Sequence, residues 1–198
     1  MGIKFLGLVL GGVALPGLGQ SGSASVDVYM SGRDDSFQLL RSGRPLASEI
    51  FAKIGIHLNW HTGELPEGQK AFGISTVERA PESAGPDALA ASRLSDSAGV
   101  EITMYRDRLH LFLNAHSRPP GSAAAYVLAH ELAHAMQGIA RHSATGIMKA
   151  HWSDSDFREM VFHKLAFTPY DIELIHRGLA ERVAAMSLER DQSRTVRK

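Results

Sequence analysis

The sequence contains no cysteine among its 198 residues. This absence excludes disulfide bonds, thiol catalysis and metal sites built on cysteine ligands. An excess of charge of one sign is also lacking, since 21 Lys and Arg residues balance 21 Asp and Glu residues. This balance argues against nucleic acid as the main partner, because phosphate binding needs a basic surface. With 44% hydrophobic and 21% charged residues, the chain has the composition of one globular domain with its own core.

The apolar run near the N-terminus, from Phe5 to Leu15, is shorter than the roughly 20 residues of a membrane-spanning helix. It is rich in glycine and is followed by small residues, a pattern typical of a secretory signal peptide. A buried N-terminal strand or an uncleaved anchor are the alternatives. We expect a secreted or periplasmic protein without stable membrane association after cleavage. The expected segments are a signal peptide (1–24), the folded domain (25–186) and a flexible tail (187–198).

Hydrophobic patterns divide the remainder of the chain into strands and helices. Alternation predicts strands at 26–30, 56–60, 71–77 and 100–105, with a short edge strand at 88–91. Helical spacing predicts helices at 45–54, 122–137 and 153–165, and a last one that opens at Thr168-Pro169. Because strands mostly precede helices, we expect an α+β fold in which helices cover a mixed sheet.

The alanine-rich helix predicted at 122–137 contains the sequence His130-Glu131-Leu132-Ala133-His134, which is H-E-x-x-H. Residues four positions apart lie on the same face of a helix, so both imidazoles can reach one Zn²⁺ at about 2.0–2.1 Å. Glu131 points to an adjacent edge of the helix. There it can take a proton from a water molecule without being a metal ligand.

A catalytic zinc site needs a third protein ligand and one open position. Gly138 can end the helix in the left-handed conformation, after which His142 is able to reach the metal from a loop. Glu159, 25 residues after the second histidine, is the alternative that a thermolysin-like ligand set would use. His151 and His163 are further alternatives.

Around this motif the sequence resembles the metzincin metallopeptidases, and among them the matrixin-like branch. The extended motif of that family is H-E-x-x-H-x-x-G-x-x-H, followed by a methionine turn beneath the metal. His142-Ser143 is similar to the family's third histidine and the serine after it, and Gly146-Ile147-Met148 is similar to its Met turn. The motif is wider here, H-E-x-x-H-x-x-x-G-x-x-x-H. Ala140 stands where the family has its third ligand.

The resemblance is specific over residues 126–148 and extends more weakly over residues 26–185, where the order of predicted elements matches the family. The segment 88–91 takes the position of the edge strand, and Asp171-Ile172 is similar to the Asp-Ile before the family's last helix. A metzincin-like fold is therefore implied. It has a mixed, mostly parallel twisted sheet with an antiparallel edge strand, a long zinc-binding helix, a Met turn and a C-terminal helix.

The resemblance implies a zinc-dependent metalloendopeptidase, a hydrolase whose catalytic domain is residues 25–186. His130, His134 and His142 would hold one catalytic Zn²⁺, Glu131 would be the general base, and Met148 would form an apolar floor beneath the metal. The partner would be a peptide or protein substrate paired with the edge strand, and the protein a monomer. Structural calcium is left open. The alternatives are Glu159 in place of His142 and a non-catalytic, zinc-containing peptide-binding domain.

Overall fold

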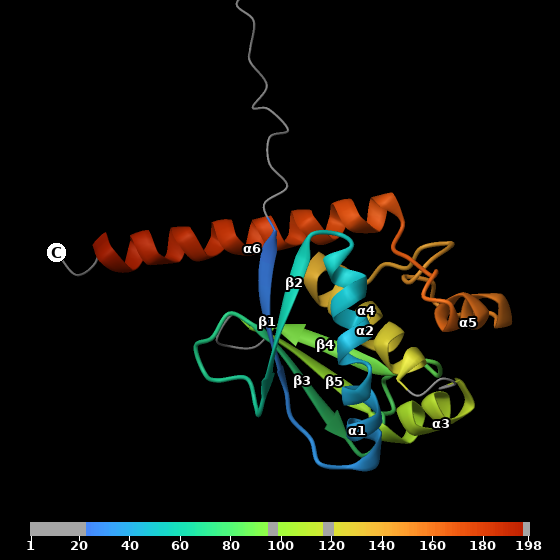
Figure 1. Cartoon of the computed structure of the whole chain (residues 1–198). Coiled ribbons are helices and arrows are strands. Elements are labelled where there is room, and N and C mark those ends of the chain that lie inside the picture. The colour runs from blue at the N-terminus through green and yellow to red at the C-terminus, as the bar shows by residue number, and fades with distance from the viewer. Residues whose placement is uncertain (1–22, 95–98, 117–120, 196–198) are drawn as a thin grey trace, which may run out of the picture.

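The computed structural model describes residues 23–94, 99–116 and 121–195, and the expected signal peptide falls almost entirely outside them. The strands are β1 (Ala24–Met30), β2 (Ile56–Thr62), β3 (Phe72–Val77), β4 (Ala90–Leu94) and β5 (Val100–Tyr105). The helices are α1 (Asp35–Ser42), α2 (Arg44–Ala52), α3 (Arg106–His116), α4 (Ser122–Gln137), α5 (Asp154–Val161) and α6 (Pro169–Thr195), all labelled in Figure 1. Among the described residues, no helix is long and apolar enough to cross a bilayer.

The strands form one sheet in the order β2-β1-β3-β5-β4. Every neighbouring pair is parallel except β4 and β5, which run antiparallel. This arrangement confirms the expected α+β class, the mostly parallel sheet and its antiparallel edge strand. The edge strand lies slightly later than predicted, because its pairing with β5 begins at Ala90 and continues to Leu94.

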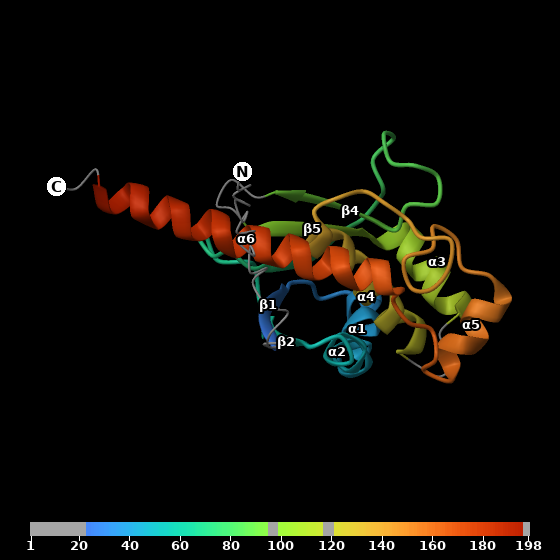
Figure 2. The ribbon, with the colours of Figure 1, turned by 90° about the horizontal axis from the view of Figure 1, so that it is seen from above.

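One face of the sheet is apolar and covered by helices. In β1, the buried residues Val26, Val28 and Met30 alternate with polar residues that point the other way. The helices α1, α2 and α4 lie on the same side of the sheet (Figures 1 and 2). The opposite face carries polar side chains, where the Asn59 amide donates to the Asp27 carboxylate. Because successive side chains of a strand point to opposite faces of the sheet, the alternation of apolar and polar residues determines which face forms the core.

Helix α4 lies at the centre of the core, and nearly all of its residues are buried. Its many alanines let neighbouring backbones approach closely. A Cβ placed on Gly43, between α1 and α2, would come within 2.4 Å of the Ala125 nitrogen. The helix has the predicted bounds and ends at Gly138, whose φ of 69° is left-handed.

Two helices were not predicted, α1 and α3. Helix α3 buries only Leu109 and Leu113, so its sequence carries one apolar pair rather than a repeated stripe. In α1, Phe37 and Leu40 are the apolar residues that reach the core. The last helix, α6, continues to Thr195, through most of the segment expected to be a tail, and projects beyond the body of the protein (Figure 1).

Candidate metal centre

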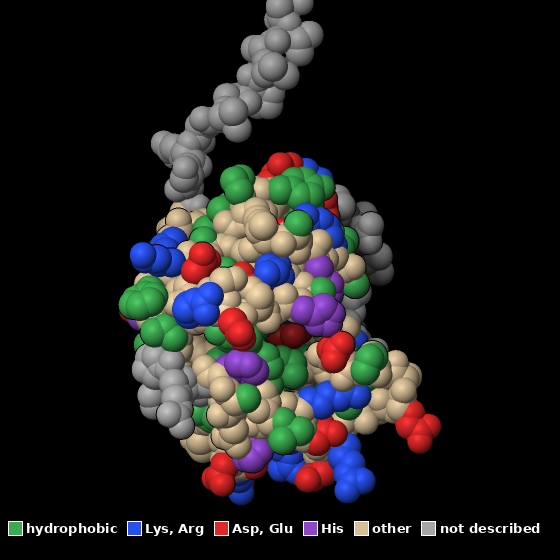
Figure 3. Space-filling view, turned by 90° about the vertical axis from the view of Figure 1, so that its right-hand side faces the viewer, with side chains coloured by type: hydrophobic (Ala, Val, Ile, Leu, Met, Phe, Trp, Pro, Cys, Tyr) green, Lys and Arg blue, Asp and Glu red, His purple; other side chains and the backbone are tan. Residues whose placement is uncertain are grey.

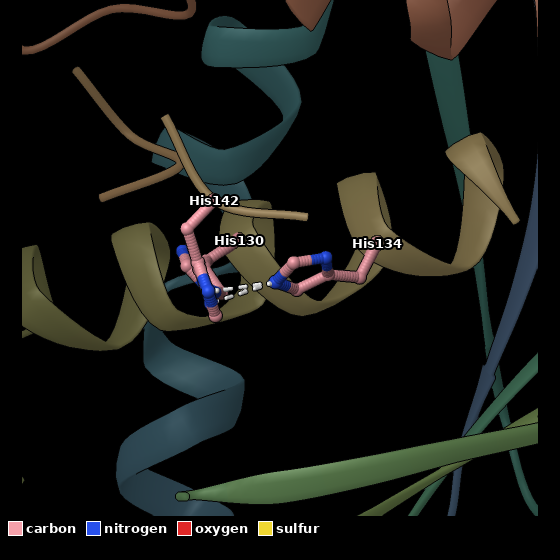
Figure 4. Close-up of side chains that lie close together, drawn as sticks. All are labelled: His130, His134 and His142. Carbon is pink, nitrogen blue, oxygen red and sulfur yellow. Dashed lines mark hydrogen bonds between the residues drawn. The ribbon is translucent and has the colours of Figure 1, made fainter. Parts of the chain in front are cut away.

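Three imidazole rings converge at the C-terminal half of α4 (Figure 4). The Nε2 atom of His134 lies 3.0 Å from Nε2 of His130 and 3.3 Å from Nε2 of His142. All three rings offer a ligand atom within 4.8 Å of the others. Nitrogens placed tetrahedrally at 2.0–2.1 Å from a zinc ion would be about 3.4 Å apart. The three histidines are therefore close enough together to hold one metal ion, and their spacing is compatible with zinc.

The two helical histidines present neutral imidazoles. The Nδ1 atom of His130 lies 2.9 Å from the carbonyl oxygen of Ile147. Because a carbonyl only accepts, Nδ1 carries the proton and the Nε2 lone pair faces the other rings. Burial, reinforced by the neighbouring histidines, lowers the pKa of both His130 and His134 to about 4. Only neutral imidazole binds metal ions, so both side chains are in the protonation state that a metal ligand needs.

A loop held at several points brings His142 to this pair. The Ser143 N–H donates to the Met148 carbonyl at 2.7 Å, and the Ile147 N–H donates to the Ala166 carbonyl at 3.0 Å. The Ile147 carbonyl accepts from His130. Met148 is fully buried in the core. Hydrogen bonds thus connect the loop of the third histidine, the turn at 146–148 and the first histidine.

Gly146 makes this turn possible, and replacing it with Ala is expected to destabilise the fold by about 2–4 kcal/mol. Its φ of 77° is left-handed, which costs a residue with a Cβ about 1–2 kcal/mol. The added Cβ would also come within 2.3 Å of the Ala166 carbonyl oxygen. Urea denaturation measures the change. Gly68→Ala is a matched control, because Gly68 has a φ of 78° and open space around its Cβ position. If both variants lose the same free energy of unfolding, the steric clash with the Ala166 carbonyl does not contribute.

Asp171, in the first turn of α6, anchors the same loop from the other side. Its fully buried carboxylate accepts hydrogen bonds from the Arg141 guanidinium at 2.9 Å and from the Ser143 hydroxyl. The Thr168 hydroxyl and N–H also donate to it. Burial alone would raise the pKa of Asp171, but these hydrogen bonds outweigh it and hold the pKa below its usual value. Asp171 therefore links Arg141 and Ser143, the two residues that flank His142, to α6 by hydrogen bonds.

We expect Asp171→Asn to destabilise the protein by about 2–3 kcal/mol at pH 7, because it leaves Arg141 without its ion-pair partner. Since the folded state lowers the pKa of Asp171, this stabilisation is present above the usual value of 3.8 and is lost as pH falls through the lower, folded-state value. Denaturation midpoints of wild type and variant should therefore converge in acid. Ser143→Ala should cost only about 1 kcal/mol. If the denaturation midpoints of wild type and Asp171→Asn differ by the same amount at every pH, the carboxylate of Asp171 does not provide this stabilisation.

Glu131 lies beside the histidines in a cleft. Two adjoining cavities of about 940 and 710 Å³ are both lined by Glu131, His134, His142 and the edge-strand residue Ala90. Burial raises the pKa of Glu131 to about 7. Within the described part of the chain, its carboxylate has no hydrogen-bond or ion-pair partner. Figure 3 shows histidine side chains beside a hollow in the surface. An unpaired carboxylate thus faces the space next to the histidines.

The other candidate ligands lie elsewhere. Among the described residues, the only group of metal-binding side chains is the three histidines, and Glu159 on α5 is exposed outside it. His151 is exposed and lines the 710 Å³ cavity, and His163 is exposed at the end of α5. The geometry therefore favours His142 as the third ligand.

The sequence did not indicate which side chains line the cleft away from the histidines. In the 710 Å³ cavity, Phe112, His116, Trp152 and Phe157 form an aromatic cluster, with His116 stacked on Phe157 at 3.9 Å between ring centroids. These residues come from α3, α5 and the segment before α5, and no sequence motif connects them. The assignment of the site depends on its own residues, because no protein-family model matches this chain and no curated protein matches it.

Proposed function

We propose that this protein is an exported zinc metallopeptidase of the metzincin type, which cleaves peptide bonds in the cleft along β4. One observation carries the proposal. Three histidine Nε2 atoms converge at a spacing that suits zinc, next to the unpaired carboxylate of Glu131. A structural zinc site normally has four protein ligands, whereas the described residues supply three. The missing ligand and the adjacent carboxylate both favour catalysis.

In the proposed reaction, the histidines and Glu131 have separate roles. A zinc ion held by the three Nε2 atoms would act as a Lewis acid on the peptide carbonyl and would acidify a water in the open position. Glu131 accepts the proton of the attacking water on its carboxylate and passes that proton to the leaving amine. The hydrogen bond from His130 to the Ile147 carbonyl keeps the first imidazole oriented.

The edge strand supplies the means of binding an extended peptide. Among the described residues, β4 pairs only with β5, so its other edge can accept a further strand. Residues of β4 line the cleft beside His134 and His142. Backbone hydrogen bonds to β4 would hold a peptide of any sequence across the site. Specificity then depends on the side chains lining the two cavities.

Peptide hydrolysis by the full chain tests the proposal. We expect a mixed peptide library to be cleaved, as seen by mass spectrometry of the new termini. Treatment with a chelator should abolish cleavage and added zinc should restore it, because the site loses and regains its metal. Cleavage that survives the chelator would contradict the proposal. Zinc and peptide binding without any cleavage would instead favour the non-catalytic peptide-binding alternative.

A further inference from the structure

Helix α6 packs against α4 and brings a cation to the cavity of about 940 Å³ that His134 and His142 also line. The approach depends on Gly178, where an added Cβ would come within 2.1 Å of the Met136 carbonyl oxygen. One turn further along α6, the Arg182 guanidinium donates a hydrogen bond to the Ala135 carbonyl at 3.0 Å. Ala135 follows the second histidine, His134, directly. The guanidinium is therefore held against the backbone one residue after a candidate metal ligand, and Arg182 and His134 line the same cavity.

Arg182 is charged, partly buried and without an acidic partner. Within the described part of the chain, its contacts are the Ala135 carbonyl and the Phe72 ring, whose centroid lies 5.3 Å from the guanidinium carbon. Arg93, which lines the same cavity, is instead paired with Glu101. A guanidinium has five N–H groups and stays charged at any physiological pH. Most of its donors are therefore available to another acceptor.

The cavity beside Arg182 is the 940 Å³ half of the cleft. It is lined by Arg182 and Glu181 of α6, by Glu131, His134 and His142, and by the edge strand from Ala90 to Arg93. The small side chains of Ala90 and Ala91 leave room along the strand. A peptide paired with β4 and cleaved at the histidines would therefore occupy the cavity that Arg182 lines.

We propose that Arg182 binds a carboxylate of the substrate, so that the cleft favours peptides with an acidic group on the Arg182 side of the cleaved bond. This inference rests on the proposed peptidase function. A guanidinium–carboxylate contact is charge-assisted and geometrically specific, and partial burial strengthens it. The carboxylate comes either from a Glu or Asp side chain or from a free C-terminus. The competing explanation is purely structural, with Arg182 neutralising the C-terminal end of the α4 dipole.

Paired peptides distinguish these explanations. Each pair differs only in Gln against Glu at one of the three positions on either side of the cleaved bond, with both ends blocked. A further Gln peptide has a free C-terminus. For the zinc-loaded full chain, we expect one position to give about a tenfold or greater gain in kcat/KM with Glu. In Arg182→Gln, the ratio of kcat/KM for the Glu peptide to kcat/KM for the Gln peptide should fall to about one. Arg177→Gln is the matched control, since Arg177 is an exposed arginine of α6 outside the cavity, paired with Glu173.

Every outcome decides between the explanations. A gain confined to the free C-terminus, and lost in Arg182→Gln, also supports the proposal and identifies the terminal carboxylate as the ligand. Equal ratios in wild type and Arg182→Gln for all peptides would overturn it and leave Arg182 as a helix cap. If Arg182→Gln does not fold, Arg182→Lys should still lower the ratio several-fold, because an ammonium cannot bind a carboxylate in the bidentate geometry.

If wild type cleaves no peptide, the peptidase proposal fails separately. The same pairs then measure Kd on the zinc-loaded chain. A Glu preference in binding that Arg182→Gln removes would retain the carboxylate site, and no preference would overturn it.

Discussion

Replacing Glu131 with Gln is expected to reduce peptide hydrolysis by about 10²–10⁴-fold while the zinc content stays at its wild-type level. The amide has nearly the same shape as the carboxylate but cannot accept the proton of the attacking water. Glu131 lines the cleft without being one of the three converging ligands, so the metal site should be unaffected. Measuring kcat/KM and metal content on the same samples separates loss of the base from loss of the metal.

Glu49→Gln is the control for this variant, because Glu49 is an exposed carboxylate on α2 away from both cavities. It should change the rate by less than about twofold, since an isolated surface charge contributes little. If Glu131→Gln cleaves peptides as fast as wild type, Glu131 is not the general base.

Replacing His142 with Ala is expected to weaken zinc binding by more than about 100-fold, because changes outside the ligand set already cost 10- to 100-fold. His142 is exposed, so its removal should leave the stability of the metal-free fold nearly unchanged. Zinc affinity is measured by competition with a chromogenic chelator, and unfolding is followed in parallel without metal.

Glu159→Ala is the matched variant for this experiment, since Glu159 is the third ligand of the thermolysin-like alternative. The positions of the side chains predict that Glu159→Ala keeps wild-type zinc affinity. Full affinity in His142→Ala together with a loss in Glu159→Ala would replace the proposed ligand set.

The features that could be predicted from the sequence are those set by short-range patterns. Helix α4 combines high helix propensity with a glycine at its end, so both of its bounds were predicted. His130 and His134 are brought together by helix periodicity alone, which acts within one turn. An antiparallel edge strand was expected from the family resemblance, although at 88–91 rather than at Ala90–Leu94, and the order of the strands in the sheet was not predicted.

The rest depends on contacts between segments far apart in the sequence. The place of His142 is fixed by bonds from its loop to Ala166 and Asp171, which no local pattern encodes. The position of Arg182 in the cavity that His134 and His142 also line requires α6 to pass the end of α4 at Gly178. Helix α3 was missed because one buried leucine pair carries too little periodicity to predict a helix.

Elemental analysis of the full chain, purified without chelators and without a histidine tag, tests the central claim that three histidines form one zinc site. The spacing of the Nε2 atoms predicts about one zinc per chain and a rise in unfolding temperature when zinc is added to metal-free protein. Protein that contains no metal, and that added zinc does not stabilise, would contradict the account and reduce the H-E-x-x-H sequence to a feature of helix packing.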